Sequence, residues 1–472
     1  MKKKPNIICI TLDHLTFMHY KFMSGAKPIL NAYEKLAAAG TEFLNARTAH
    51  PLCLPVRASM LTGVYTHKHG KLRNGRFDNE KEYPLVSSFL ADAGYKSGYF
   101  GKNHSGFELE GQFEGYYPKG YGNPYLTKEY REYLKKENLP NPVYRQEWHV
   151  GHYPNDRYDL TVTNNFNTYT AGIMQGDERA HEACFLISLA EEWIEKNKGG
   201  KPYFLRLDFW GPHQAFTVPE KYAGILGDKE IEMYPTFNDG AENRPSFVRE
   251  FAKNVRGRNP RIKTWDDFKL VLQRAYEHFT FIDAMIGKFI DGLEDRENTV
   301  ITYSADHGDA LGSHGGLVDK AGDLMDEVMR IPLVVSAPGY PAGVKSELFA
   351  SNLDLPATVL DFAGIPVPDY MDGRSLMPVA GGDCGGWRED FMAEHYGHFD
   401  VHAVQRALYW KNYKYVATEG HVSELYDLQK DPFETGNLID DSAFAEVRAE
   451  MERRLANNIR QFGDADAKAA LL

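Results

Sequence analysis

A cysteine, a proline and an arginine are closely spaced in the segment CLPVR, at Cys53, Pro55 and Arg57. Pro55 suits the first turn of a helix, so Cys53 is expected near the N-cap, where unpaired N–H groups and the helix dipole stabilise a negative or polarised group. Arg57 lies four residues later on the same face and is expected to reach back to the thiol. Gly63 would then end the short helix. The spacing favours a polarised thiol over a small buried cysteine beside a surface arginine.

Acidic residues follow two predicted strands and indicate a cation site. Asp13 directly follows one apolar run, and Asp306 with His307 follows another. Because the carboxyl ends of neighbouring parallel strands meet at one edge of a sheet, these side chains are expected to converge. Two carboxylates and an imidazole form a suitable site for a divalent cation. His14 leaves two alternatives: as a ligand it makes the site softer and more tolerant of Mn²⁺ or Zn²⁺, and if it points away the cation loses one ligand.

Short β-rich runs alternate with amphipathic segments over the first three quarters of the chain. Buried strands are expected at Ile7–Leu12, Lys96–Phe100, Tyr203–Phe209, Thr299–Ser304 and Pro332–Ser336. Helices are expected at residues 29–37, Ala180–Lys196, Phe268–Glu294 and Leu353–Ala363. This alternation predicts an α/β fold with a large mixed, mostly parallel sheet sandwiched by helices. Such a sheet presents its catalytic loops at the carboxyl ends of the strands.

Two regions depart from the alternation. Residues about 107–175 are rich in Gly, Pro, Asn and Tyr, and they are predicted to form a long irregular insertion without sheet elements. Towards the C-terminus we expect two short strands and a final helix, at Val404–Trp410, Tyr413–Ala417 and Phe444–Phe462. We therefore predict a catalytic domain over residues 1–365 and a small α+β subdomain with a short antiparallel sheet over residues 366–472.

The composition restricts the class of partner and the location. The chain has 472 residues, of which 43% are hydrophobic, so it should bury a large core. Its formal net charge is −12 with both signs interspersed, and no basic stripe for nucleic acid is visible. No segment approaches the roughly 20 apolar residues that span a bilayer. The N-terminus lacks a leader cleavage site and the four cysteines show no CxxC or disulfide pattern, so we expect a cytoplasmic protein.

The segment around Cys53 resembles the sulfatase signature, in which the cysteine is converted after translation to formylglycine. Cys53, Pro55, Arg57 and the pair Thr62-Gly63 match that signature, whereas position 56 is commonly Ser or Ala in the family and is valine here. Further resemblances follow in the family's order along nearly the whole chain, at Asp13, Gly101 to His104, Phe209 to His213, Ser304 to Gly308, Leu311 to Lys320, Asp354 to Thr358, Asp372 to Leu376 and Glu424 to Pro432. The resemblance implies an alkaline phosphatase-like fold.

The resemblance also implies a set of site residues. The expected metal ligands are Asp13, His14, Asp306, His307 and the formylglycine formed from Cys53. The expected catalytic residues are Cys53, Arg57, Lys102, His104, His213 and Lys320. One divalent cation is expected, in the first place Ca²⁺, with Mn²⁺, Mg²⁺ or Zn²⁺ as alternatives. In this scheme the formylglycine hydrate attacks sulfur, His213 protonates the leaving alcohol and His104 acts as base when sulfate is expelled. Lys102 and Lys320 stabilise the developing charge, and Arg57 orients the hydrate.

Two alternative functions stay open from the sequence. Phosphonate monoester hydrolases or phosphodiesterases of the same superfamily also use formylglycine and an Asp, Asp-His metal site, but they lack the charged pair that Lys102 and His104 form here. A sulfatase-like binding protein without catalysis would show eroded ligands or missing lysines. Among the expected ligands only position 14 departs, since many sulfatases have a second acid there and this chain has a histidine. The resemblance therefore favours a sulfuric ester hydrolase.

The expected substrate is a small sulfated molecule, preferably a carbohydrate. Tyrosines and tryptophans of the insertion could stack on sugar rings, although they could equally pack the insertion onto the core. Choline sulfate fits less well, with Trp148 and nearby tyrosines as the candidate cation cage. The expected protein partner is a formylglycine-generating maturation enzyme, and neither nucleic acid nor a membrane is expected to bind.

Overall fold

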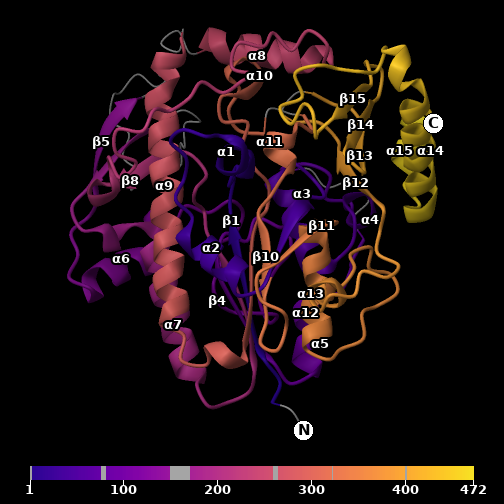
Figure 1. Cartoon of the computed structure of the whole chain (residues 1–472). Helices are drawn as coiled ribbons and strands as arrows, with labels where there is room; N and C mark the ends of the chain where they lie inside the picture. Colours follow the sequence, from indigo (N-terminus) through magenta and orange to yellow (C-terminus); the bar gives the residue numbers. More distant parts are fainter. Residues whose placement is uncertain (1–2, 76–80, 149–170, 259–263, 321–322, 399–400) are drawn as a thin grey trace.

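The computed structural model describes residues 3–75, 81–148, 171–258, 264–320, 323–398 and 401–472. An eight-stranded sheet runs through its centre (Figure 1). In spatial order its strands are β11 (Val344–Ser351), β2 (Thr41–Arg47), β10 (Leu333–Ser336), β9 (Thr299–Ala305), β1 (Asn6–Leu12), β7 (Tyr203–Asp208), β3 (Lys96–Gly101) and β4 (Glu114–Tyr116). Among these described strands only β10 runs against its neighbours, so the sheet is mostly parallel, as predicted.

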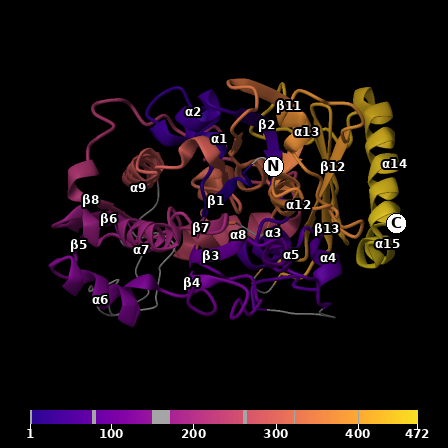
Figure 2. The ribbon, with the colours of Figure 1, turned by 90° about the horizontal axis from the view of Figure 1, so that it is seen from below.

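Side chains of β1 alternate between two helical layers. Ile8 and Ile10 face a core shared with α2 (Asn31–Ala38), α7 (Glu182–Asn197) and α9 (Trp265–Asp291). Ile7 and Cys9 face the opposite core, shared with α3 (Cys53–Thr62), α5 (Val86–Asp92) and α12 (Leu355–Phe362). Seen from below, these two groups of helices lie on either side of the sheet (Figure 2). The predicted sheet sandwiched by helices is confirmed, and β1 is apolar on both faces because both are covered.

Shorter helices complete this part of the chain. They are α1 (Phe17–Phe22), α4 (Thr66–His69), α6 (Lys128–Lys136), α8 (Ser246–Arg258), α10 (Ser313–Gly316), α11 (Asp326–Met329) and α13 (Met377–Ala380). Helix α9 begins three residues before its predicted start at Phe268, because Thr264 and Asp267 form a capping box. Within the described part of the chain, none of the helices combines the length and the apolar character that crossing a bilayer requires.

A second sheet, which is antiparallel, lies near the C-terminus. Its strands are β12 (Asp390–His395), β13 (Gln405–Trp410), β14 (Tyr413–Thr418) and β15 (Glu424–Asp427), followed by α14 (Ala445–Phe462) and α15 (Ala465–Leu471). Leu408 of β13 packs towards α14, whereas its neighbours Ala407 and Tyr409 pack in a core shared with residues of the main sheet region. The small α+β unit with a short antiparallel sheet is confirmed, and its boundary at residue 365 stays a prediction.

The insertion over residues about 107–175 contains sheet structure, so the prediction that it would be irregular is wrong. β4 pairs with β3 at the edge of the main sheet, and β5 (Val143–Trp148), β6 (Ala171–Gln175) and β8 (Phe216–Pro219) form a three-stranded sheet. β4 can approach β3 closely because Gly115 has no side chain. A Cβ atom at this position would come within 2.3 Å of the Tyr99 carbonyl oxygen. Residues 149–170 and the Trp148 side chain lie outside the described residues.

His67 of α4 connects the main fold to the C-terminal unit. Its Nδ1 lies 2.5 Å from Glu394 Oε1 and 4.0 Å from Asp464 Oδ2. Its Nε2 lies 3.1 Å from the carbonyl oxygen of Phe462. Burial opposes protonation of this imidazole, but the two carboxylates outweigh burial and raise the pKa of His67 to about 9.

We expect the His67→Gln variant to be less stable than the wild type at about pH 6 and to lose much of that difference at about pH 10. Since the folded-state pKa lies above the unfolded value of about 6.5, the stabilisation is complete below that value and is lost as the pH rises through about 9. Such a shift corresponds to roughly 3 kcal/mol. Denaturant unfolding from about pH 6 to about pH 10 measures the difference in the free energy of unfolding between the variant and the wild type. The control is His421→Gln, which changes an exposed histidine. A pH-independent loss would contradict the ionic contribution.

Candidate active site

The predicted site residues lie where the parallel strands of the main sheet end. Asp13 and His14 follow β1, and Asp306 and His307 follow β9, its neighbour in the sheet. The remaining predicted residues come from the end of β3, the loop after β7, the start of α3 and the loop between α10 and α11, at Lys102, His104, His213, Cys53, Arg57 and Lys320. Parallel pairing therefore delivers segments that are far apart in the sequence to one edge of the sheet.

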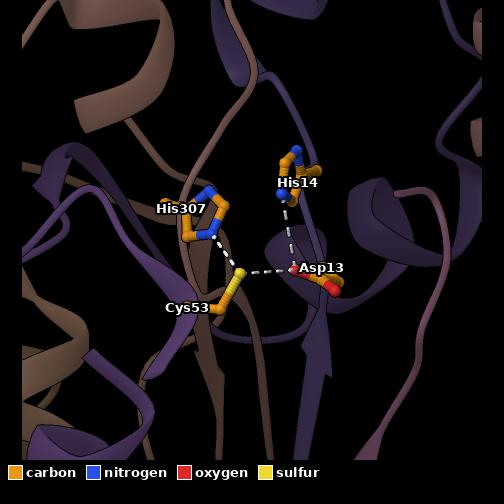
Figure 3. A group of neighbouring side chains, drawn as sticks. All are labelled: Asp13, His14, Cys53 and His307. Atoms are coloured by element: carbon orange, nitrogen blue, oxygen red, sulfur yellow. Dashed lines mark hydrogen bonds and ion pairs between the residues drawn. The ribbon is translucent and has the colours of Figure 1, made fainter. Parts of the chain in front are cut away.

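Asp13, His14, Cys53 and His307 form the centre of the site (Figure 3). All four are buried, and one donor atom of each lies within 4.8 Å of the others. His307 Nε2 is 3.2 Å from Cys53 Sγ, which is 3.8 Å from Asp13 Oδ1. His14 Nε2 is 3.9 Å from the same oxygen. Ligands on opposite sides of one Ca²⁺ ion are about 5 Å apart, so this donor set fits a single divalent cation.

Asp306 connects the segment after β1 with the segment after β9. Its Oδ1 accepts the backbone N–H of His307 at 2.8 Å and that of His14 at 3.3 Å. Its Oδ2 accepts a hydrogen bond from Arg57 Nε at 2.9 Å. Burial opposes ionisation of this carboxyl, but the neighbouring His307 and Arg57 outweigh burial and hold the pKa of Asp306 below its usual value. Asp306 is therefore an ionised, fixed carboxylate beside the centre.

Arg57 makes different contacts from those expected. The spacing predicted a contact with the Cys53 thiol, but Nη1 donates to the carbonyl oxygen of Lys102 at 2.8 Å and to Asp208 Oδ2 at 3.3 Å. Nε binds Asp306. A buried guanidinium needs carboxylate partners, and tertiary contacts supply them here. Arg57 is thus placed to orient acids of the site instead of the thiol.

Two buried lysines add positive charge around the centre. Lys102 Nζ contacts Asp13 Oδ2, and Lys320 Nζ lies 2.5 Å from Asp319 Oδ1. Burial opposes ionisation of the Cys53 thiol, but the charges of Lys102 and Lys320 outweigh burial and lower the pKa of Cys53 to about 6. The surroundings of position 53 therefore favour a negative or strongly polarised group.

His104 and His213 flank Tyr121 from the insertion. Their ring centres lie 5.6 Å and 5.5 Å from that of Tyr121, whose ring is also 4.2 Å from Lys102 Nζ. His213 Nδ1 lies 2.8 Å from the carbonyl oxygen of Gln214. Burial is the main cause that lowers the pKa of both histidines, that of His213 to about 4. Both imidazoles are therefore neutral in the free protein.

Several residues at the site were not predicted: Tyr121, Asp208, Asp309 and Asp319. Asp208 ends a buried strand, as Asp13 does, and this signal could have found it. Asp309 and Asp319 lie in a glycine-rich loop, where acids usually serve turns. Burial, followed by the charge of Asp319, raises the pKa of Asp309 to about 7, although two backbone N–H groups oppose this shift.

The chain matches known proteins over nearly its whole length. Residues 5–365 match the sequence profile of the family described as Sulfatase, and residues 312–461 match the profile described as N-sulphoglucosamine sulphohydrolase, C-terminal. The uncharacterized sulfatase YidJ of Escherichia coli K12 is 27% identical, with 98% of this chain and 88% of the relative covered. The N-acetylglucosamine-6-O-sulfatase of Bacteroides thetaiotaomicron is 25% identical, with the same coverage of 98% and 88%.

A solved structure shares the fold. The phosphonate monoester hydrolase of Silicibacter pomeroyi superimposes with a TM-score of 0.78, covers 98% of this chain and 96% of its own, and is 21% identical. At 21% identity, this structural similarity establishes the fold alone. The family profile, in contrast, covers more than half of the sequence and includes Cys53. The chain belongs to the sulfatase family and is a sulfuric ester hydrolase.

Proposed function

We propose that this sulfatase cleaves the sulfate monoester of a small sulfated carbohydrate, with a formylglycine derived from Cys53 as its nucleophile. The position of residue 53 carries the proposal. It is the first residue of α3, and its buried side chain lies 3.2 Å from His307 Nε2 and 3.8 Å from Asp13 Oδ1. The charges of Lys102 and Lys320 already favour the thiolate at this position, and they would equally favour a hydroxyl of an aldehyde hydrate as it loses its proton.

One divalent cation belongs to this proposal. The proposed ligands are Asp13, His14, Asp306, His307 and the formylglycine at position 53. When bound, the cation would supply positive charge close to the reacting oxygens. We take Ca²⁺ as the first choice, with Mn²⁺, Mg²⁺ and Zn²⁺ as alternatives, because two carboxylates suit a hard ion and two imidazoles suit a softer one.

In the first step, one hydroxyl of the hydrate releases its proton to solvent and attacks sulfur. The bond from sulfur to the leaving alcohol breaks as the new S–O bond forms. Lys102 and Lys320 stabilise the negative charge that develops on the transferred group. His213 is the proposed acid that gives the leaving oxygen its proton. Burial lowers the pKa of His213 to about 4 in the free protein, so its protonation relies on the charge of the bound ester, which raises that pKa.

In the second step, the remaining hydroxyl loses its proton and collapses to the aldehyde, and sulfate leaves. His104 is the proposed base. Burial holds its pKa well below the usual value, so the imidazole is neutral. Its buried Nδ1 has no hydrogen-bond partner among the described residues. The aldehyde hydrate thus avoids the need for water to cleave a stable sulfated enzyme.

We expect nitrophenyl sulfate to be turned over with a kcat/KM at least about tenfold higher than a nitrophenyl phosphonate or bis-nitrophenyl phosphate. The physical reason is that the charge of Lys102 and the neutral imidazole of His104 lie beside the centre, as the resemblance to sulfatases implies for sulfate monoesters. Steady-state kinetics on one metal-loaded preparation measure the three values. A higher value for either phosphorus ester would replace the proposal by its alternative.

That alternative, a phosphonate monoester hydrolase or phosphodiesterase, is favoured by the pair Asp306-His307. The retained Lys102 and His104 weigh against it. A binding protein without catalysis is disfavoured further, because Asp13, His14 and His307 lie together around position 53 and the charges of both lysines act on it.

The name of the Bacteroides thetaiotaomicron relative supports a sulfated sugar as substrate. Tyr121 also brings one aromatic ring of the insertion to the site, where it could contact a pyranose. Steady-state kinetics with sulfated monosaccharides and with choline sulfate test whether the substrate is a sulfated carbohydrate. The maturation enzyme and the cytoplasmic location stay predictions from the sequence.

A further inference from the structure

His14 is the metal-site position at which the chain departs from the acid common among sulfatases, and its ring is fixed on two sides. The residue adopts φ 65°, a region that non-glycine residues seldom occupy, so tertiary contacts must hold it. Nδ1 lies 2.9 Å from Asp309 Oδ2, and Nε2 contacts Lys320 Nζ. The ring is fully buried.

The surroundings of Asp309 determine what it can offer to His14. Its Oδ1 accepts two backbone N–H groups, from Leu311 and Asp319, each at 2.8 Å. Its Oδ2 is left to face His14 Nδ1. The ionised form of Asp309 only accepts hydrogen bonds, so Nδ1 then carries the imidazole proton and Nε2 carries the lone pair.

Lys320 supports the same tautomer from the opposite side of the ring. An ammonium group only donates hydrogen bonds, and its contact with Nε2 therefore requires a lone pair there. Nε2 is also the atom of His14 that faces Asp13, at 3.9 Å from Oδ1 (Figure 3). The nitrogen that carries the lone pair is thus the one that borders the donor atoms of the proposed cation site.

We propose that Asp309 is a positioning residue that locks His14 in the Nδ1–H tautomer, so that Nε2 serves as a nitrogen ligand of the cation. This inference rests on the metal site of the proposed function. A carboxylate behind a ligating imidazole orients the ring and raises its basicity. Nitrogen in place of an acid oxygen shifts the preference of the site from Ca²⁺ towards Mn²⁺ or Zn²⁺.

The Asp309→Asn variant tests the tautomer with almost no change of shape. The amide oxygen must stay with the backbone N–H groups of Leu311 and Asp319. In the opposite flip the amide NH₂ group would face these two buried N–H donors, and none of the three would have an acceptor. The amide nitrogen then donates to His14 Nδ1 and forces the proton onto Nε2. We expect the Kd for Mn²⁺ to rise about 10- to 100-fold. Calorimetric titration of the metal-stripped full-length chain with Mn²⁺ measures it.

A double-mutant cycle with His14→Asp supplies the matched control. An acid at position 14 has no tautomer, so Asp309→Asn should not weaken Mn²⁺ binding in that background. His14→Asp alone should raise the affinity for Ca²⁺ relative to Mn²⁺. Circular dichroism and unfolding curves confirm that each variant is folded before its Kd is compared.

Two results would overturn the inference. If the Asp309→Asn variant binds Mn²⁺ with wild-type affinity, His14 Nε2 accepts a hydrogen bond from Lys320 and does not bind the cation. An equal loss in both backgrounds would mean that Asp309 acts through its loop and not through the imidazole. Metal affinity is measured without any ester, so a failure of the proposed sulfatase chemistry would leave these results unchanged and would be recognised separately by the ester kinetics.

Discussion

The Cys53→Ala variant is expected to lose sulfate-ester hydrolysis by about a thousandfold or more, because removing a nucleophile leaves only binding and electrostatic stabilisation. The side chain of residue 53 lies between His307 and Asp13, and alanine offers no oxygen or sulfur to either. Steady-state turnover of a nitrophenyl sulfate measures the loss. Unfolding curves should be close to those of the wild type, since one buried sulfur atom is removed from a helix start.

A cysteine outside the site gives the matched control. Cys384 is exposed, and Cys384→Ala should retain wild-type turnover. Intact and peptide mass spectrometry of the active wild-type protein should show that the thiol of residue 53 has been replaced by an aldehyde. Unmodified Cys53 in fully active protein would refute the formylglycine step, although loss of activity in Cys53→Ala would then still identify a nucleophile.

The parts of the site that could be predicted follow from regular backbone geometry. Asp13 and Asp306 end two buried strands, and parallel pairing of β1 with β9 places such ends side by side. Pro55 lies in the first turn of a short helix, and Gly63 closes that helix at φ 75°. Local signals of this kind depend on periodicity and on a few special residues, so one sequence is enough to find them.

The parts that could not be predicted depend on partners distant in the sequence. Arg57 has Cys53 four residues away, yet it binds Asp306, which is 249 residues away, because a buried guanidinium is stabilised by carboxylates. Asp309 resembles a turn former, and its contact with His14 spans 295 residues. Neither contact leaves a spacing signal in the chain. The network of contacts around the proposed cation site is therefore a property of the tertiary fold.

The insertion shows how composition can conceal sheet structure. In the described part of the insertion, the Gly, Pro and Asn residues lie largely in connections. The short strands β4, β5 and β6 carry few of the β-branched residues that mark a strand. Tyr121 reaches His104 and His213 from a connection beyond β4. From the sequence, one could therefore expect that aromatic residues of the insertion contribute to the site, but not which residue does so.

The Lys102→Met variant is expected to lower kcat/KM for the sulfate ester by about 100- to 1000-fold, with most of the loss in kcat. Methionine keeps the length and apolar packing of the lysine but removes the charge that contacts Asp13 and favours ionisation at position 53. Because that charge acts most strongly as negative charge develops, its loss raises the barrier more than it weakens binding. Steady-state kinetics at saturating cation separate the two parameters.

The control for Lys102→Met must remove a lysine charge without touching the site. Lys221 is exposed and pairs with Glu178 on the surface, so Lys221→Met should leave both parameters unchanged. Cation affinity has to be measured as well, since Asp13 loses its lysine partner in Lys102→Met and could hold the cation differently. A kcat within about threefold of the wild type, with normal cation affinity, would exclude Lys102 from transition-state stabilisation and leave it as a structural partner of Asp13.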